Sequence, residues 1–174
     1  MLPDGVVIRR GQPSDAEGIF AYMDALSHEG DIDLPLAPGE FEAQYTLERE
    51  RELLQRWAEG DNALYLVAVA EGQIIGSLNC LGHHRRAMRH DAALGITVRR
   101  EWRGRGIDSA MLAEAVRWAR EGGVIKRIHL EVYARNRRAI SLYMRHGFQV
   151  EGLHRRTVYQ GGEYLDEYTM ALLL

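Results

Sequence analysis

The chain has 174 residues, of which 46% are hydrophobic and 27% are charged, a composition that excludes a mainly disordered protein and is typical of one soluble domain. The longest apolar run, residues 63–70, is too short to cross a bilayer, and the start of the chain has no secretory-signal pattern. The single cysteine, Cys80, cannot form an internal disulfide. We therefore expect one cytoplasmic domain, residues 6–174, with no metal site.

The net charge of −3 combines two regions of opposite sign. Residues 1–60 contain 13 acidic and 5 basic side chains, whereas residues 61–174 contain 12 acidic and 17 basic ones. Seven arginines fall within residues 85–105. Solvated surfaces explain this asymmetry, and so does an anionic ligand near the later region. RNA binding through residues 85–105 is a third interpretation, but the acidic chain has no nucleic-acid-binding motif, so we expect no nucleic-acid partner.

Hydrophobic periodicity and turn residues predict eleven elements in an α/β chain with hairpins mixed in, which differs from the strict alternation of a doubly wound sheet. Ser14 and Asn136 are suited to cap helices, and Gly147 to end one. In chain order we expect a strand at 6–10, helices at 14–28 and 46–59, strands at 64–70, 73–81 and 91–98, a helix at 104–120, a strand at 127–133, a helix at 137–146, and strands at 148–159 and 164–173. A loop is expected at 30–39, and hairpin turns at 71–72 and 160–163.

The glycine-containing segment 103–109 joins a predicted strand to a predicted helix. Glycines allow the backbone to approach a ligand closely, and the first N–H groups of a helix have no internal partner, so the segment suits a phosphate. The segment is equally consistent with a tight strand-to-helix turn. It lacks the third glycine of a dinucleotide-binding motif, because Ser109 stands there, and it lacks the Gly-Lys-Ser/Thr of a P-loop.

The residues around this segment resemble the GCN5-related N-acetyltransferase (GNAT) family. The resemblance covers about residues 6–174, and it departs from the usual pattern at Glu101 and Asp108, two acids that would oppose a bound phosphate. It implies a mixed α/β fold with a mostly antiparallel, seven-stranded sheet, a splayed pair of strands and about four flanking helices. The motifs that carry it are Ile96-Thr97-Val98, Arg103-Gly104-Arg105-Gly106-Ile107, Leu130-Glu131-Val132, Asn136 and the segment 139–148.

This resemblance implies transfer of an acetyl group from acetyl-CoA to a primary amine of a small molecule, such as an amino acid, a polyamine or an antibiotic-like amine, by direct attack in a ternary complex. A non-catalytic CoA-binding sensor and an acetyltransferase of a protein N-terminus are the alternatives, and homodimerisation stays open. No membrane partner is expected. The resemblance assigns cofactor binding to Ile96, Thr97, Val98, Arg103, Gly104, Arg105, Gly106, Ile107, Asp108, Ser109 and Asn136.

Two proton transfers accompany this chemistry, because the attacking amine must be neutral and the departing thiolate needs a proton. Glu131 is the expected base, since strand alternation places it opposite the core face and partial burial would raise its pKa. A salt bridge with an arginine is the other explanation of Glu131, and His129 is the rival base. The resemblance implies that Tyr143 is the acid, and its phenol is protonated at neutral pH, although its helix face also suits core packing. Cys80 is expected to be a core residue.

The acceptor is not identified by the sequence. In the fold that the resemblance implies, the two early helices and the last hairpin line the acceptor side. This places acidic residues near an incoming cation. The acids concerned are Glu29, Asp31 and Asp33, the segment Glu40–Glu42, Glu163, Asp166 and Glu167.

Overall fold

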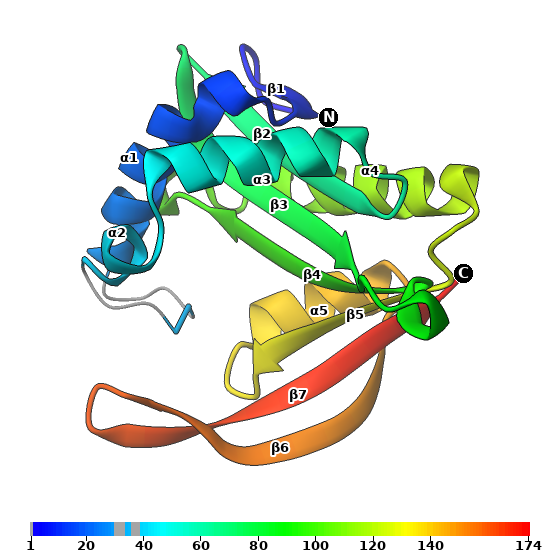
Figure 1. Ribbon diagram of the computed structural model, residues 1–174. Helices are drawn as coiled ribbons and strands as arrows, with labels where there is room; N and C mark the ends of the chain where they lie inside the picture. Colours follow the sequence, from blue (N-terminus) through cyan, green and yellow to red (C-terminus); the bar gives the residue numbers. More distant parts are fainter. Residues whose placement is uncertain (1, 30–33, 36–38) are drawn as a thin grey trace.

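The computed structural model describes residues 2–29, 34–35 and 39–174, and its centre is a seven-stranded sheet (Figure 1). The strand order is β1-β2-β3-β4-β5-β7-β6, and every neighbouring pair is antiparallel except β4 and β5. The predicted mixed fold with a mostly antiparallel sheet is therefore confirmed. The strands are β1 (Val7–Arg10), β2 (Ala63–Ala70), β3 (Gln73–Gly82), β4 (Asp91–Val98), β5 (Arg127–Tyr133), β6 (Gln149–Gln160) and β7 (Glu163–Leu173).

The four predicted helices are present, together with a short helix, α2, that the periodicity did not indicate. Helix α2 has five residues, too few for a repeating apolar pattern. In the part of the chain that the structure describes, no helix is long and apolar enough to cross a membrane. The helices are α1 (Ala16–Ser27), α2 (Glu40–Gln44), α3 (Leu47–Glu59), α4 (Ile107–Gly122) and α5 (Arg137–Arg145).

The prediction that Ser14 caps the first helix is wrong. Ser14 lies inside a 3₁₀ turn, Pro13–Asp15, which precedes α1. Asp15 Oδ2 accepts a hydrogen bond from the Gln12 N–H at 2.8 Å and forms an ion pair with Arg9 at 2.7 Å. These contacts hold the carboxylate in the turn, so the chain makes the 3₁₀ turn first and α1 begins after Asp15.

The predicted cap of the last helix and both hairpin turns are confirmed. Asn136 Oδ1 accepts a hydrogen bond from the Ala139 N–H at 3.0 Å, and Gly147 follows α5 with a φ of +90°. Glu71 and Gly72 have φ values of 51° and 76°, which is the pattern of a type I′ turn. Two glycines with positive φ, Gly161 and Gly162, make the same connection between β6 and β7.

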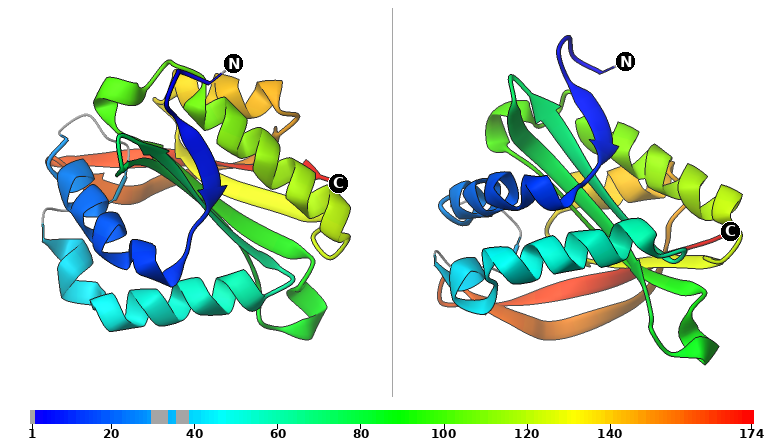
Figure 2. Two further views of the ribbon diagram at one scale, coloured as in Figure 1. Left: turned by 90° about the horizontal axis from the view of Figure 1, so that it is seen from above. Right: turned by 45° about the horizontal axis from the view of Figure 1, so that its top comes forward.

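Two hydrophobic layers cover the two faces of the sheet, with α1 and α3 on one side and α4 on the other (Figure 2). Alternate residues of β2 point to opposite layers: Leu64 and Leu66 pack with α4, whereas Tyr65 and Val67 pack with α1 and α3. Cys80 is fully buried in the α4 layer, as expected for a core residue.

Candidate active site

Strands β4 and β5 diverge and open the sheet. They pair in parallel only where residues 91–93 face residues 127–129. Beyond these residues β4 stays paired with β3 and β5 stays paired with β7. Figure 1 shows the two strands close together at one end and apart at the other, with α5 beside the opening. The splayed pair implied by the resemblance is present.

A groove of about 290 Å³ lies at this opening. It is formed by the end of β4, the loop before α4, and the first turns of α5. Six of the residues expected to bind the cofactor line it, together with Tyr143 and with Arg138, which the sequence had not indicated. The full lining is Ile96, Thr97, Val98, Arg103, Asp108, Asn136, Arg138, Ala139, Leu142 and Tyr143.

The loop before α4 presents a row of backbone N–H groups. Gly104 and Gly106 have φ values of 75° and 81°, so α4 begins at Ile107 and not at residue 104. The Arg103 N–H donates to Arg100 O, and the Ser109 N–H donates to Asp108 Oδ1 at 2.9 Å. Between them, the N–H groups of residues 104–108 have no acceptor in the described part of the chain. Such donors at the positive end of a helix dipole suit an anion.

Three side chains of this loop have structural contacts and do not line the groove. The Arg105 guanidinium lies 4.9 Å from the centroid of the Trp102 ring. Ile107 is 1% exposed and belongs to the core. Ser109 Oγ lies 2.9 Å from His146 Nε2, which ties the first turn of α4 to the end of α5. The hydroxyl of Ser109 therefore already has a partner, and the part of this residue that lies near the open N–H row is its backbone.

Charged side chains beside the groove are held by ion pairs. Arg103 pairs with Glu29, and its Nε donates to Val98 O at 2.9 Å. Arg138 Nη2 lies 3.6 Å from Asp108 Oδ2. Glu101, expected to oppose a phosphate, is exposed, lies 3.5 Å from Arg99 Nε and is not among the groove residues. Of the two acids that depart from the family pattern, only Asp108 lines the groove.

Tyr143 lies where the groove meets a larger cavity. Its ring is 7% exposed and packs against Phe148 with a centroid separation of 5.9 Å. Burial, with a smaller contribution from the Asp108 carboxylate, raises its pKa to about 12. The phenol is therefore protonated at neutral pH and is able to donate a proton. The ring of Tyr143 therefore packs in the core and also lines both the groove and the larger cavity.

Glu131 lies on the face of β5 that the alternation predicted. Its neighbours Leu130 and Val132 are buried in the α4 layer, and Glu131 lines the larger cavity on the opposite side. The expectation of partial burial is wrong, because Glu131 is exposed. Among the described residues it forms no ion pair, so the alternative explanation by a salt bridge with an arginine is not supported.

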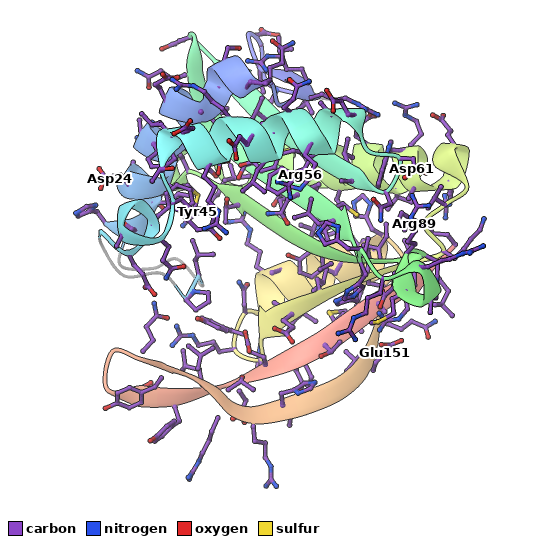
Figure 3. The ribbon with its side chains drawn as sticks, viewed as in Figure 1. Asp24, Tyr45, Arg56, Asp61, Arg89 and Glu151 are labelled. Carbon is purple, nitrogen blue, oxygen red and sulfur yellow. The ribbon has the colours of Figure 1, made fainter. Side chains whose placement is uncertain are left out.

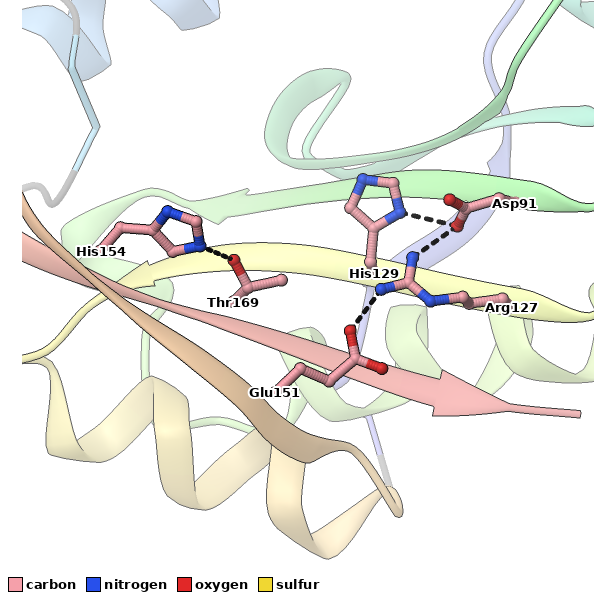
Figure 4. Close-up of polar contacts among 6 residues, drawn as sticks. All are labelled: Asp91, Arg127, His129, Glu151, His154 and Thr169. Atoms are coloured by element: carbon pink, nitrogen blue, oxygen red, sulfur yellow. Dashed lines mark hydrogen bonds and ion pairs between the residues drawn. The ribbon is translucent and has the colours of Figure 1, made fainter. Parts of the chain in front are cut away.

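His129 also lines the larger cavity, and its ring is fixed by an acid (Figure 4). Its Nδ1 lies 2.8 Å from Asp91 Oδ1, and Arg127 Nη1 lies 2.7 Å from the same oxygen. Partial burial acts to raise the pKa of Asp91, but the hydrogen bonds from Arg127 and His129 outweigh it, and the pKa lies below its usual value. Asp91 thus stays ionised and orients the imidazole, and Nε2 has no hydrogen-bond partner among the described residues.

The larger cavity, of about 800 Å³, extends from the opening over the face covered by α1 and α3. Much of its lining is aromatic: Phe41, Tyr45, Trp57, Tyr65, Tyr133 and Tyr143. Tyr45, labelled in Figure 3, lies where α2 leads into α3. Besides these tyrosines, the charged or titratable lining among the described residues is Arg49, Glu50, His129, Glu131 and Glu167. With three carboxyl groups and one arginine in its lining, the cavity favours a cationic ligand.

The acids expected near the acceptor have different positions. Glu167 lines the larger cavity. Glu29 does not, because its carboxylate pairs with Arg103 and accepts from the Arg100 N–H at 3.1 Å. Asp166 accepts from the Arg156 N–H within the β6–β7 hairpin. Asp31, Asp33 and the side chain of Glu42 lie outside the described residues.

The sequence reasoning missed Glu50, although a signal was present. The apolar face of α3 carries Leu47, Leu54 and Trp57, and Glu50 occupies a position on that same face. A charged residue at a core position of an amphipathic helix is costly unless it has a function or a partner. The periodicity therefore marked the residue, but the many charges of the helix concealed it.

Residues 34–148 match the family model described as the acetyltransferase (GNAT) family. The chain belongs to the GNAT family. It is 33% identical over 117 residues to the L-amino acid N-acetyltransferase AaaT of Escherichia coli (strain K12), a match that covers 67% of this chain and 72% of that protein. It is 30% identical over 137 residues to the N-alpha-acetyltransferase MAK3 of Arabidopsis thaliana, covering 76% of this chain and 67% of that protein.

Solved structures of GNAT proteins share the fold. A GNAT-family acetyltransferase of Streptococcus pneumoniae superposes with a TM-score of 0.91 at 32% identity, covering 97% of this chain and 99% of that one. The yncA protein of Salmonella typhimurium, whose structure contains acetyl-CoA, superposes with a TM-score of 0.80 at 18% identity, covering 98% and 95%. The family predicted from the motifs is confirmed, and the chain is a GNAT N-acetyltransferase.

Proposed function

We propose that this GNAT enzyme transfers the acetyl group of acetyl-CoA to a primary amine of a small molecule, by direct attack in a ternary complex. One observation carries the proposal: the groove and the larger cavity share part of their lining. The shared residues are Ile96, Thr97, Asn136, Ala139 and Tyr143. A donor in the groove and an acceptor in the cavity would meet there, and direct transfer needs that proximity.

The residues of the groove fit acetyl-CoA, which supplies an activated acetyl thioester when it is bound. The open N–H groups of residues 104–108 and the guanidinium groups of Arg103 and Arg138 would hold its phosphates. The backbone of Ile96–Val98 would align the pantetheine arm in the manner of an added strand. Asn136 keeps its Nδ2 donors for the same arm, because its Oδ1 is used in capping α5.

Two side chains would move the protons. Glu131, exposed in the cavity, would take a proton from the attacking ammonium, directly or through water. Tyr143 would donate its phenolic proton to the departing sulfur, since its raised pKa keeps it protonated. His129 is the second candidate base, because its Nε2 is free while Nδ1 is held by Asp91.

A protein N-terminus is the second candidate acceptor, supported by the activity in the name of the MAK3 relative. It carries the same reacting group but extends away from it as a peptide. A non-catalytic CoA sensor would need the groove without the catalytic pair, so Glu131 and Tyr143 in the cavity favour the enzyme.

An amine panel scored by thiol release and by mass gain tests the proposal. The panel contains amino acids, diamines, aminoglycosides and peptides with free N-termini. Acetylation of small amines with kcat/KM above that of the peptides is the expected result. Preference for peptides would support the second acceptor, and coenzyme A binding without thiol release on any amine would contradict enzymatic function.

A further inference from the structure

Glu50 differs from the other acids of its helix. Its side chain is 4% exposed, whereas Glu48, Glu52 and Glu59 on the same helix are exposed. It lines the larger cavity from α3, the helix that packs on β2. A buried carboxylate that bears charge is expensive unless a partner compensates it.

The structure provides no such partner among the described residues. Glu50 forms no ion pair or side-chain hydrogen bond there, and desolvation raises its pKa above the usual range. In that same part of the chain, no side-chain oxygen or nitrogen that is sealed from solvent lacks a hydrogen-bond partner. The carboxylate oxygens of Glu50 are therefore open to the cavity, and a ligand within it can reach them.

Aromatic rings line the same cavity as this carboxylate. Trp57 and Tyr65 stack with their centroids 5.5 Å apart, and Phe41 and Tyr45 stack at 4.8 Å. Aromatic faces attract cations, and the Arg49 guanidinium already lies 5.7 Å from the centroid of Tyr45. A carboxylate combined with aromatic faces suits an ammonium or guanidinium group rather than an anion or a neutral chain.

The position of Glu50 separates it from the reacting amine. Its neighbour Tyr65 is registered with Asn79 on β3, which is registered with Gly95 on β4. Two strand spacings, about 10 Å, thus separate the Tyr65 backbone from the strand beside the groove. A group held at Glu50 is therefore distinct from the nitrogen that attacks near Tyr143.

We propose that Glu50 binds a second cationic group of the acceptor, so that the preferred substrates are small amines with two positive charges, such as diamines and basic amino acids. This inference rests on the proposed function and specifies its substrate class. Besides the tyrosines, the other charged or titratable side chains that line the cavity in the described part of the chain are Arg49, His129, Glu131 and Glu167. None of them forms an ion pair with Glu50.

Matched acceptors that differ only in the distal charge test the proposal. 1,4-Diaminobutane is compared with 1-aminobutane, and lysine with norleucine, in the parent enzyme and in the Glu50→Gln variant. The parent should favour the doubly charged member by about tenfold to a hundredfold in kcat/KM, the range for one charge-assisted hydrogen bond. Glu50→Gln should remove that preference through a higher KM for the acceptors that carry the distal charge, and it should change kcat/KM for 1-aminobutane and norleucine, which lack that charge, by no more than about twofold. Glu52→Gln, an exposed acid on the same helix, should change neither.

Thermal melting supplies a readout that does not depend on turnover. The Glu50→Gln variant should melt at or above the parent temperature, because a buried charge is removed. Added 1,4-diaminobutane should raise the Tm of the parent and not that of the variant.

Equal kcat/KM within each acceptor pair, equal losses on both members in Glu50→Gln, or a lower Tm of that variant without ligand would overturn the proposal. If no amine releases thiol, the proposed function fails. The diamine-dependent Tm then still decides whether Glu50 binds a cation.

Discussion

Replacing Tyr143 by phenylalanine isolates one hydroxyl group. The ring would keep its packing against Phe148, and the hydroxyl has no hydrogen-bond partner among the described residues. The free energy of unfolding should therefore change by less than about 1 kcal/mol. If the phenol protonates the departing thiolate, kcat should fall by about 10²–10⁴, equivalent to about 2.7–5.4 kcal/mol of activation free energy.

The pH dependence makes this prediction sharper. Because burial and Asp108 raise the pKa of Tyr143 to about 12, the phenol stays protonated up to strongly alkaline pH. The ratio of parent to variant kcat should thus be constant from about pH 6 to about pH 10. Stopped-flow or continuous thiol-release assays at saturating acetyl-CoA measure it, and acetyl-CoA affinity should be little changed.

Tyr159 provides the matched control, because it is a tyrosine with 65% exposure on β6 and is not among the residues that line the groove or the cavity. Tyr159→Phe should turn over at the parent rate. Parent-like kcat in Tyr143→Phe would show that the phenol only packs. An alkaline loss of parent activity well below pH 10 that Tyr143→Phe does not share would contradict the raised pKa of Tyr143, because it would show that the phenol already deprotonates there.

Four further predictions concern other groups. Glu131→Gln should lower kcat/KM, remove the acidic limb of the pH–rate profile and recover partly at high pH as free amine accumulates; retention of that limb would point to His129 or water. Gly106→Val places a branched residue at a φ of 81°, so it should cost about 1–2 kcal/mol of stability and weaken coenzyme A binding in calorimetry, and unchanged affinity would contradict the loop assignment. Asp108→Asn should tighten coenzyme A binding severalfold, because it removes from the groove a negative charge that repels the phosphates of coenzyme A. Weaker binding of coenzyme A in calorimetry would refute this prediction. Burial raises the pKa of the Cys80 thiol to about 12, so iodoacetamide at pH 8 should label it only in denaturant. Because the thiol of the unfolded chain ionises near the ordinary pKa of 9.0, the contribution of Cys80 to stability should decline as the pH rises above that value. Cys80→Ala should reduce this alkaline loss of stability.

The parts of the fold that follow local rules could be predicted from the sequence. The turn at Glu71-Gly72, the cap at Asn136 and the alternation of β5 around Glu131 each depend on a few neighbouring residues. The cap at Ser14 failed because Asp15 competes for the same turn through a side-chain contact with Arg9. The sequence pattern does not show which of two neighbouring side chains forms the contacts of a turn, because that depends on the three-dimensional position of partners such as Arg9.

Contacts between residues far apart in the sequence limit how much of the site could be predicted. The ion pair between Glu29 and Arg103 joins residues 74 positions apart, so the sequence could assign Glu29 only by its charge. Arg138 reaches the groove because α5 and the end of β4 line it together, an arrangement that no local signal indicates. Glu50 could be predicted from the periodicity of α3, because it is a charged residue at a position on the apolar face of that helix.

The short pairing of β4 with β5 divides the sheet into two half-sheets. Three registered positions join a half-sheet of β1–β4 to a half-sheet of β5–β7, and the Asp91 carboxylate fastens that junction by binding both Arg127 and His129 across it. Within each half the strands pair along most of their length, whereas the backbone ladder between the halves is confined to one end. The molecule is therefore built as two half-sheets joined by a short backbone ladder and by a shared hydrophobic layer, and the groove and the cavity lie where that ladder ends.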